Sequence, residues 1–231
     1  MKRPKRTAQD ARAAREGTGR PPQLKAEVQE FKRRRILEEA RDLFYADGYE
    51  ATTLDAIAEA LKVTKPFLYS YFKNKSEILN AICEVGIRSS LKALDEALLS
   101  SLPPRDKLKL IVERVTSIIL QDQKYIVVYE REEKNLEPRE AKELMALRKQ
   151  FGVRLAELLE AGNKSGEFDV PDPLLTAVSI GGLMTWVASW YRPTGRWSKT
   201  EVIVHMIRNV DGMVARRPAG GKAGEPVAVE R

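Results

Sequence analysis

The chain has 231 residues, of which 43% are hydrophobic and 32% charged, and its formal net charge is +7. This length and composition predict a soluble globular protein of one large or two smaller modules. No early stretch has the pattern of a secretory signal, so we expect a cytoplasmic protein. With one cysteine, Cys83, and one histidine, His205, we expect no intrachain disulfide, no metal site, no cofactor and no His-based catalytic triad.

Much of the positive charge lies near the N-terminus. The first 25 residues hold eight basic and two acidic side chains, and the body of the chain is close to neutral. A basic tail on a neutral body favours a polyanionic partner, although a solubilising tail has the same composition. We expect residues 1–27 and 218–231 to be disordered tails outside the fold.

Between these tails, apolar residues recur three and four positions apart, which predicts an all-α fold of about nine helices. A first helix ends at Asp47-Gly48, where glycine can adopt the left-handed conformation. Two short helices follow, over 54–61 and from about 65 to 72, with Thr52 or Thr53 available as the N-cap of the first and Thr64 as the N-cap of the second. Residues 28–75 are therefore predicted to form a small three-helix module.

A larger module is predicted from residue 76 to residue 217. Asn74 and Glu77 have the spacing of a capping box and open a long amphipathic helix that ends before Pro103. Later helices are expected at about 105–121, 124–135, 138–162, 172–191 and 198–216.

The two short helices and the joint Lys62-Val63-Thr64 have the dimensions of a helix-turn-helix, in which the second helix enters the major groove of DNA. An apolar cluster can fix the pair, and polar or basic side chains lie on the outer faces of the second helix. Nine residues are candidate DNA ligands: Thr53, Thr64, Lys65, Phe67, Tyr69, Ser70, Tyr71, Lys73 and Lys75. The alternatives are a buried core role for Tyr69 and a solvated charge for Lys73.

The runs 48–58 and 63–79 resemble the DNA-binding region of the TetR family of bacterial repressors. The shared pattern is a pair of threonines, then Ile-Ala, Val-Thr, Leu-Tyr, an aromatic-Phe pair and Asn-Lys. The resemblance implies phosphate contacts from Thr53, Tyr69, Tyr71 and Lys75, and base contacts from Lys65 and Ser70. Lys62 and Pro66 stand where the family often has glycine, and Lys62 is strained if its backbone is left-handed.

Aromatic and polar side chains in the larger module could line an apolar effector cavity, although solid core packing explains each of them equally well. The runs 129–132 and 185–193 resemble TetR-like regulators of fatty-acid, steroid or aromatic catabolism that respond to CoA thioesters. This implies an acyl-CoA effector, and Gly182 stands where some relatives have a side chain that grips the ligand. The candidates are Tyr125, Tyr129, Met145, Arg148, Phe151, Trp186, Trp190 and Arg192.

Residues 173–191 contain no charged side chain, a length that reaches the lower limit of a membrane span. Small and hydroxyl residues dilute this segment, so we expect a buried helix and no membrane partner. The TetR resemblance implies that the last two helices pair with their copies in a homodimer, which would present two recognition helices to a palindromic operator. The candidate interface residues are Leu183, Val187, Trp190, Val202, Met206 and Met213.

The sequence thus predicts a ligand-responsive transcriptional regulator, a repressor that a small apolar effector or an acyl-CoA thioester releases from its operator. We expect it not to be an enzyme. One alternative is an acyl-CoA-handling enzyme, which would need an acid and base pair that we do not find. The other is a protein that coats nucleic acid non-specifically through its basic tail.

Overall fold

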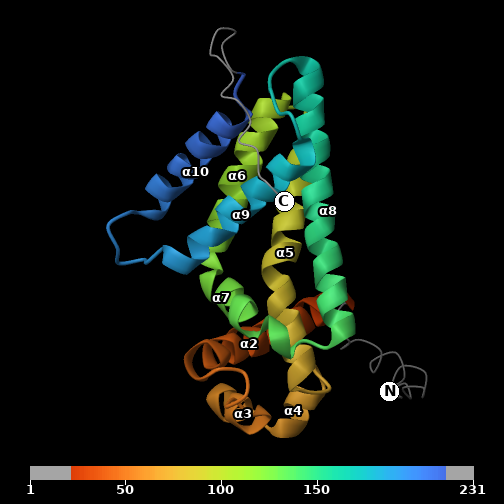
Figure 1. Ribbon diagram of the computed structural model, residues 1–231. Coiled ribbons are helices and arrows are strands. Elements are labelled where there is room, and N and C mark those ends of the chain that lie inside the picture. Colours follow the sequence, from red (N-terminus) through yellow and green to blue (C-terminus); the bar gives the residue numbers. More distant parts are fainter. Residues whose placement is uncertain (1–21, 217–231) are drawn as a thin grey trace, which may run out of the picture.

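The computed structural model describes residues 22–216, and over this range the chain is helical, with nine α-helices, one 3-10 turn and no strand (Figure 1). The first helix begins at Pro22, so the expectation that residues 22–27 belong to a tail is wrong. Proline is well suited to the first turn of a helix because its φ is already helical and the missing N–H has no partner there. The rest of both expected tails lies outside the described residues.

The elements are α2 (Pro22–Asp47), α3 (Leu54–Leu61), α4 (Lys65–Tyr69), α5 (Lys75–Leu99), α6 (Pro104–Gln121), α7 (Gln123–Glu132), η1 (Glu133–Asn135), α8 (Pro138–Ser165), α9 (Pro173–Trp190) and α10 (Lys199–Val214).

Side-chain caps explain where several helices begin. Thr53 caps α3 by accepting a hydrogen bond from the Ala56 N–H at 3.1 Å, and Asn74 caps α5 by accepting one from the Glu77 N–H at 2.8 Å. The Glu77 carboxylate accepts from the Lys73 N–H, one residue before the expected partner, so the predicted capping box at Asn74 is only half formed. Thr64 occupies the N-cap position of α4 without a side-chain capping bond.

The lower part of Figure 1 is a small unit built from α2, α3 and α4. Its core holds Ile36, Phe44, Ile57, Leu68 and Phe72, all less than 3% exposed. The same buried cluster continues into the start of α5 and into α7 and α8. The core therefore does not end at residue 75, and the small unit is packed onto the rest of the chain.

The upper part of Figure 1 contains the second half of α5 together with α6, α8, α9 and α10. These helices share a second buried cluster, in which α8 packs against α5 and α9, and α6 packs against α5, α9 and α10. At about 1.5 Å per residue, the 25 residues of α5 span roughly 37 Å and belong to both clusters.

Candidate DNA-binding surface and effector cavity

The helix-turn-helix is held by a compact apolar cluster and a tight joint. Ile57, Ala58, Leu68 and Phe72 are buried, as the sequence predicts, and Val63 packs against them half-buried. Lys62 has φ 55° and ψ 42°, the left-handed conformation. This conformation lets its N–H donate to the Glu59 carbonyl at 2.9 Å, and the joint then turns directly into α4. A residue other than glycine in this conformation carries a strain of about 1 kcal/mol.

The outer face of α4 is open to solvent. Tyr69 is 51% exposed, so the alternative of a buried core tyrosine is wrong. The Lys65 ammonium lies 2.8 Å from the Asp55 carboxylate of α3, and this hydrogen bond raises the pKa of Lys65. Both side chains are largely exposed, so a competing phosphate can replace the carboxylate at small cost.

Phe67 of α4 and the two residues that follow this helix, Ser70 and Tyr71, have partners inside the unit. The Phe67 and Tyr71 rings pack against each other with centroids 5.1 Å apart, and both side chains are half-buried. The Ser70 hydroxyl donates to the Phe67 carbonyl at 2.7 Å and remains exposed. Thr53 is exposed as well, with its hydroxyl oxygen accepting the capping bond described above. Tyr71, Ser70 and Thr53 thus remain within reach of a ligand at the surface.

Lys73 and Lys75 differ in what their side chains do. Lys73 is exposed beyond the end of α4, as a phosphate ligand or a solvated charge would be. The Lys75 ammonium points back to the turn after α2, where it donates to the carbonyls of Tyr49 at 2.7 Å and Thr52 at 3.0 Å and lies 4.1 Å from the Tyr49 ring centroid. Lys75 therefore ties the start of α5 to the turn before α3, a role that the sequence did not predict.

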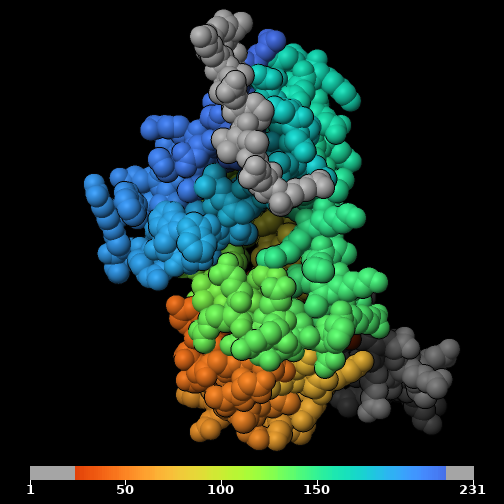
Figure 2. Space-filling model, viewed as in Figure 1, coloured from red at the N-terminus to blue at the C-terminus, as the bar shows by residue number. Residues whose placement is uncertain are grey.

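A cavity of about 450 Å³ lies inside the larger part of the chain, between α5, α6, α7, α8 and α9. Figure 2 shows the hollow between α7, α8 and α9, with α5 visible at its floor. Four of the eight predicted effector residues line it: Tyr125, Tyr129, Arg148 and Phe151.

The other four predicted effector residues do not line the cavity. Met145 and Trp186 are 60% and 64% exposed and point away from it, because the helical period places them on the outer faces of α8 and α9. Trp190 packs edge-on against Trp197, with ring centroids 6.0 Å apart. Arg192 is exposed, and its guanidinium donates to the Ser189 and Tyr191 carbonyls. The sequence prediction for these four residues is wrong.

Small residues form much of the wall that sequence reasoning missed. Gly152 of α8 and Gly181 and Gly182 of α9 line the cavity, and a Cβ built on any of the three meets no atom within 4 Å. The pair Gly181-Gly182 on α9 and the isolated Gly152 on α8 are the signal that could have indicated this space. The remaining wall residues that were not predicted are Cys83, Gly86, Ile87, Ser90, Val115, Ile119, Ile126, Lys149, Ala177, Val178, Met184 and Thr185.

The cavity is apolar over most of its wall and has a polar end. The Arg148 guanidinium lies 4.2 Å from the Tyr129 ring centroid, and Lys149 is next to it in the wall. Burial raises the pKa of the Cys83 thiol to about 12, and nearby carboxylates such as Glu133 add to this shift. The arrangement suits a ligand with an apolar body and an anionic group near Arg148.

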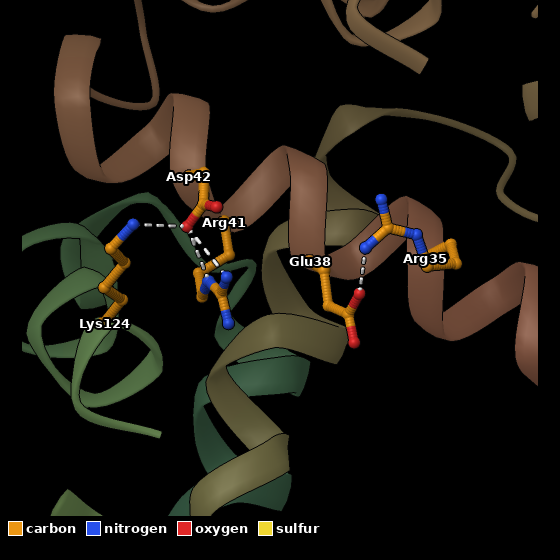
Figure 3. Close-up of polar contacts among 5 residues, drawn as sticks. All are labelled: Arg35, Glu38, Arg41, Asp42 and Lys124. Atoms are coloured by element: carbon orange, nitrogen blue, oxygen red, sulfur yellow. Dashed lines mark hydrogen bonds and ion pairs between the residues drawn. The ribbon is translucent and has the colours of Figure 1, made fainter. Parts of the chain in front are cut away.

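Helix α7 is both a wall of the cavity and a contact surface for α2. Tyr125 lines the cavity, and the Arg41 guanidinium of α2 lies 4.6 Å from its ring centroid. In Figure 3, Lys124 and Arg41 both point to Asp42, and the Lys124 ammonium lies 2.9 Å from the carboxylate. Burial raises the pKa of Asp42, but the hydrogen bonds from these two cations outweigh it and leave this pKa lowered. Further along α7, the Arg131 guanidinium donates to the Tyr45 carbonyl at 3.0 Å.

Helix α9 is long and apolar enough to span a membrane by length and composition, yet only 28% of its 18 residues are buried. The single chain alone therefore leaves much of this helix exposed, and its burial in a dimer interface stays a prediction. Leu175, Val178 and Trp186 are exposed on α9, and Val204 and Met213 are exposed on α10. They do not share one face, because nine positions place Val204 and Met213 on opposite sides of α10 and Val178 also lines the cavity.

The predicted dimer residues divide into two groups. Val187, Val202 and Met206 are at most 5% exposed and belong to the core of the chain itself, so their assignment to an interface is wrong. Leu183 and Trp190 are half-buried, and Met213 is 39% exposed. On α9 and α10, the apolar residues that face outward lie one or two positions from the buried ones. The spacing of apolar residues alone does not determine which side of such a helix faces the core.

An exposed helix-turn-helix joined to a helical module with an internal cavity defines the class of one-component DNA-binding regulators. Residues 36–82 match the family described as "Bacterial regulatory proteins, tetR family", and residues 101–214 match "Tetracyclin repressor-like, C-terminal domain". The chain belongs to the TetR family of DNA-binding transcriptional regulators, and no catalytic family is indicated.

Relatives and solved structures agree with this assignment. The chain is 28% identical over 177 residues to the HTH-type transcriptional repressor KstR2 of Rhodococcus jostii, an alignment that covers 76% of this chain and 87% of KstR2. The crystal structure of the TetR family regulator PfmR from Thermus thermophilus matches with a TM-score of 0.71 and 29% identity, over 79% of this chain and all of that one. AibR in complex with isovaleryl coenzyme A and operator DNA matches with a TM-score of 0.65 and 25% identity, over 79% of this chain and 97% of AibR.

Proposed function

We propose that this protein is a cytoplasmic, homodimeric repressor that binds a palindromic operator and is released from it by a small apolar effector or an acyl-CoA thioester. The observation that carries the proposal is that α7 contributes Tyr125 and Tyr129 to the cavity and also packs on α2 of the DNA-binding unit. A ligand in the cavity therefore touches the element that positions the helix-turn-helix.

The DNA ligands in this proposal are the exposed groups around α4. Lys65, Tyr69 and Ser70 face outward from the recognition helix, and Lys73 follows it at the surface. The proposed DNA ligands at the edges of the recognition helix are Thr53, Thr64, Phe67 and Tyr71. In the effector site, Tyr125, Tyr129 and Phe151 would contact the apolar body of the ligand, and Arg148 its anionic group.

The structure of AibR with isovaleryl coenzyme A and operator DNA supports an acyl-CoA effector by similarity. The cavity of about 450 Å³ is large enough for an acyl chain and too small for a whole CoA thioester. The CoA phosphates would therefore lie outside, near Arg148 and Lys149.

The proposed mechanism is a shift between two arrangements of the dimer. An effector that binds better when α7 has moved away from its position against α2 would favour that arrangement and lower operator affinity. A ligand that binds both arrangements equally would have no effect, so release requires contact with the part of the wall that moves.

The homodimer in this proposal uses exposed apolar residues of α9 and α10. A lone protomer would expose Leu175 and Trp186 of α9 and Val204 of α10 to water, and pairing with a second copy would bury this apolar area. The dimer places two recognition helices about 34 Å apart, one turn of DNA, so that both half-sites of a palindrome are bound.

The test combines DNA selection with an effector panel. The full-length protein is used to select duplexes from random sequence, and binding of the selected duplex is measured with and without CoA thioesters of increasing acyl length and the matching free acids. We expect preference for the selected duplex, a reduced preference in Lys65→Ala, which removes an implied base contact, and release by at least one thioester.

A cavity variant separates effector binding from DNA binding. Gly152→Leu projects a side chain into the space, and Gln150→Leu, on an exposed position of the same helix, is the control. We expect both variants to bind the selected duplex and only Gly152→Leu to lose release by the effector. Equal affinity for selected and random duplexes would overturn the proposal, and turnover of a thioester would favour an enzyme.

A further inference from the structure

The N-terminal half of α2 extends beyond the core that the rest of the helix packs on. Between Leu24 and Arg35 no side chain is buried, whereas Ile36 and Leu37, which follow directly, are 1% and 5% exposed. At about 1.5 Å per residue, this stretch continues the helix for roughly 18 Å. Five of its side chains are basic and two are acidic, so it carries a net positive charge.

The C-terminal end of this basic stretch lies beside the recognition helix α4. The Lys32 ammonium lies 5.8 Å from the ring centroid of Phe67, in α4, and the Arg33 guanidinium lies 4.9 Å from the ring centroid of Phe72, just after α4. A duplex that receives α4 in its major groove therefore passes close to Lys32, with its phosphates at the groove edge.

Helical periodicity places a second lysine in line with the first. Lys25 is seven positions, almost two turns, before Lys32, so the two side chains leave the helix on the same side, and both are exposed. They are about 10 Å apart along the axis, which is close to three phosphate steps of one DNA strand. Arg35 lies three positions after Lys32, but its guanidinium is 2.6 Å from the Glu38 carboxylate and is partly neutralised.

We propose that Lys25 and Lys32 bind the phosphates of duplex DNA flanking the groove that α4 occupies, so that α2 extends the DNA contact beyond the helix-turn-helix. The inference rests on the proposed function in that it assumes operator binding by α4. Double-stranded DNA is the occupant that fits, because the stretch is basic, lies next to the recognition helix and presents its charges at a spacing close to that of phosphates.

The experiment measures the salt dependence of binding to a duplex selected from random sequence by the full-length protein. Each phosphate contact contributes about 0.9 to the slope of log affinity against log salt, which corresponds to roughly eightfold in affinity at 0.1 M salt. We expect the double variant Lys25→Ala with Lys32→Ala to lower the slope by about 1.8 for each protomer that contacts DNA. The ratio of affinities for selected and random duplexes should change little, since phosphate contacts do not distinguish sequences.

Two controls make the outcome decisive. Lys92→Ala with Lys164→Ala removes two exposed lysines from α5 and from the far end of α8, away from the DNA-binding unit, and should leave the slope unchanged. Lys25→Arg with Lys32→Arg keeps both charges and should retain the wild-type slope.

Shortening the selected duplex on both sides of the half-sites should remove the difference between wild type and the alanine variant. An alanine variant with the slope of the Lys92 and Lys164 control would overturn this inference while leaving operator binding by α4 intact. Loss of sequence preference in the wild type would instead overturn the proposed function.

Discussion

Lys75 offers a sharp test of the geometry because the sequence and the structure assign it different roles. The TetR resemblance implies a phosphate contact, whereas the ammonium donates to the Tyr49 and Thr52 carbonyls at 2.7 and 3.0 Å. Hydrogen bonds from a charged group contribute about 1.5–3 kcal/mol each when buried, and the half-buried position of Lys75 reduces this contribution. We therefore expect Lys75→Ala to lower the free energy of unfolding by about 2 kcal/mol, mostly through loosening of the turn over residues 48–53.

Lys73→Ala is the matched control two residues earlier, because the Lys73 side chain is exposed and its backbone N–H, which bonds Glu77, is retained. We expect this variant to keep wild-type stability and to lower the salt slope of DNA binding by about 0.9. Stability is measured by urea unfolding followed by circular dichroism, and amide hydrogen exchange reports on the turn. The structural role of Lys75 would be refuted if Lys75→Ala kept wild-type stability and lowered the salt slope of DNA binding by about 0.9.

Three further predictions concern the fold and the cavity. Gly162→Ala should destabilise the protein by about 2–3 kcal/mol in urea unfolding, because its Cβ would lie 1.9 Å from the buried Phe168 ring; wild-type stability would contradict this packing. Lys62→Gly should raise the free energy of unfolding by about 0.5–1 kcal/mol by relieving the left-handed strain, and Lys62→Ala, which keeps the strain, should not. Cys83, the one cysteine in the chain, should react with iodoacetamide at pH 8 roughly 1000-fold more slowly than in urea, because its pKa of about 12 leaves little thiolate. A reaction as fast in the folded protein as in urea would show that the thiol is not buried.

The helix-turn-helix was well predicted because its constraints are local. Apolar spacing, the Thr53 N-cap and the short joint fix α3 and α4 within a few residues, and side chains that must avoid the apolar cluster face outward. The strain expected of a left-handed Lys62 follows from the same short-range geometry, and its φ of 55° confirms the conformation.

The cavity and the exposed apolar residues of α9 and α10 were harder to predict because both depend on how distant helices face one another. Sequence reasoning selected the aromatic residues of α9, yet Trp186 points outward and the small residues Gly181 and Gly182 border the cavity. Likewise Val187 and Met206 pack inside the chain, and the exposed apolar positions are their neighbours in the helical turn. An apolar helix carries too weak a periodic signal to fix its orientation from sequence alone.

The length of α5 has a mechanical consequence. The middle of this helix borders the cavity at Gly86 and Ser90, and its N-terminal end carries Lys75, which hydrogen-bonds to the turn before α3. If α5 is treated as a rigid rod of about 37 Å that pivots at its C-terminal end, a tilt of about 5° displaces its N-terminal end by about 3 Å. This displacement is close to the rise of one base pair. A movement too small to disrupt either core would thus suffice to put two half-sites out of register.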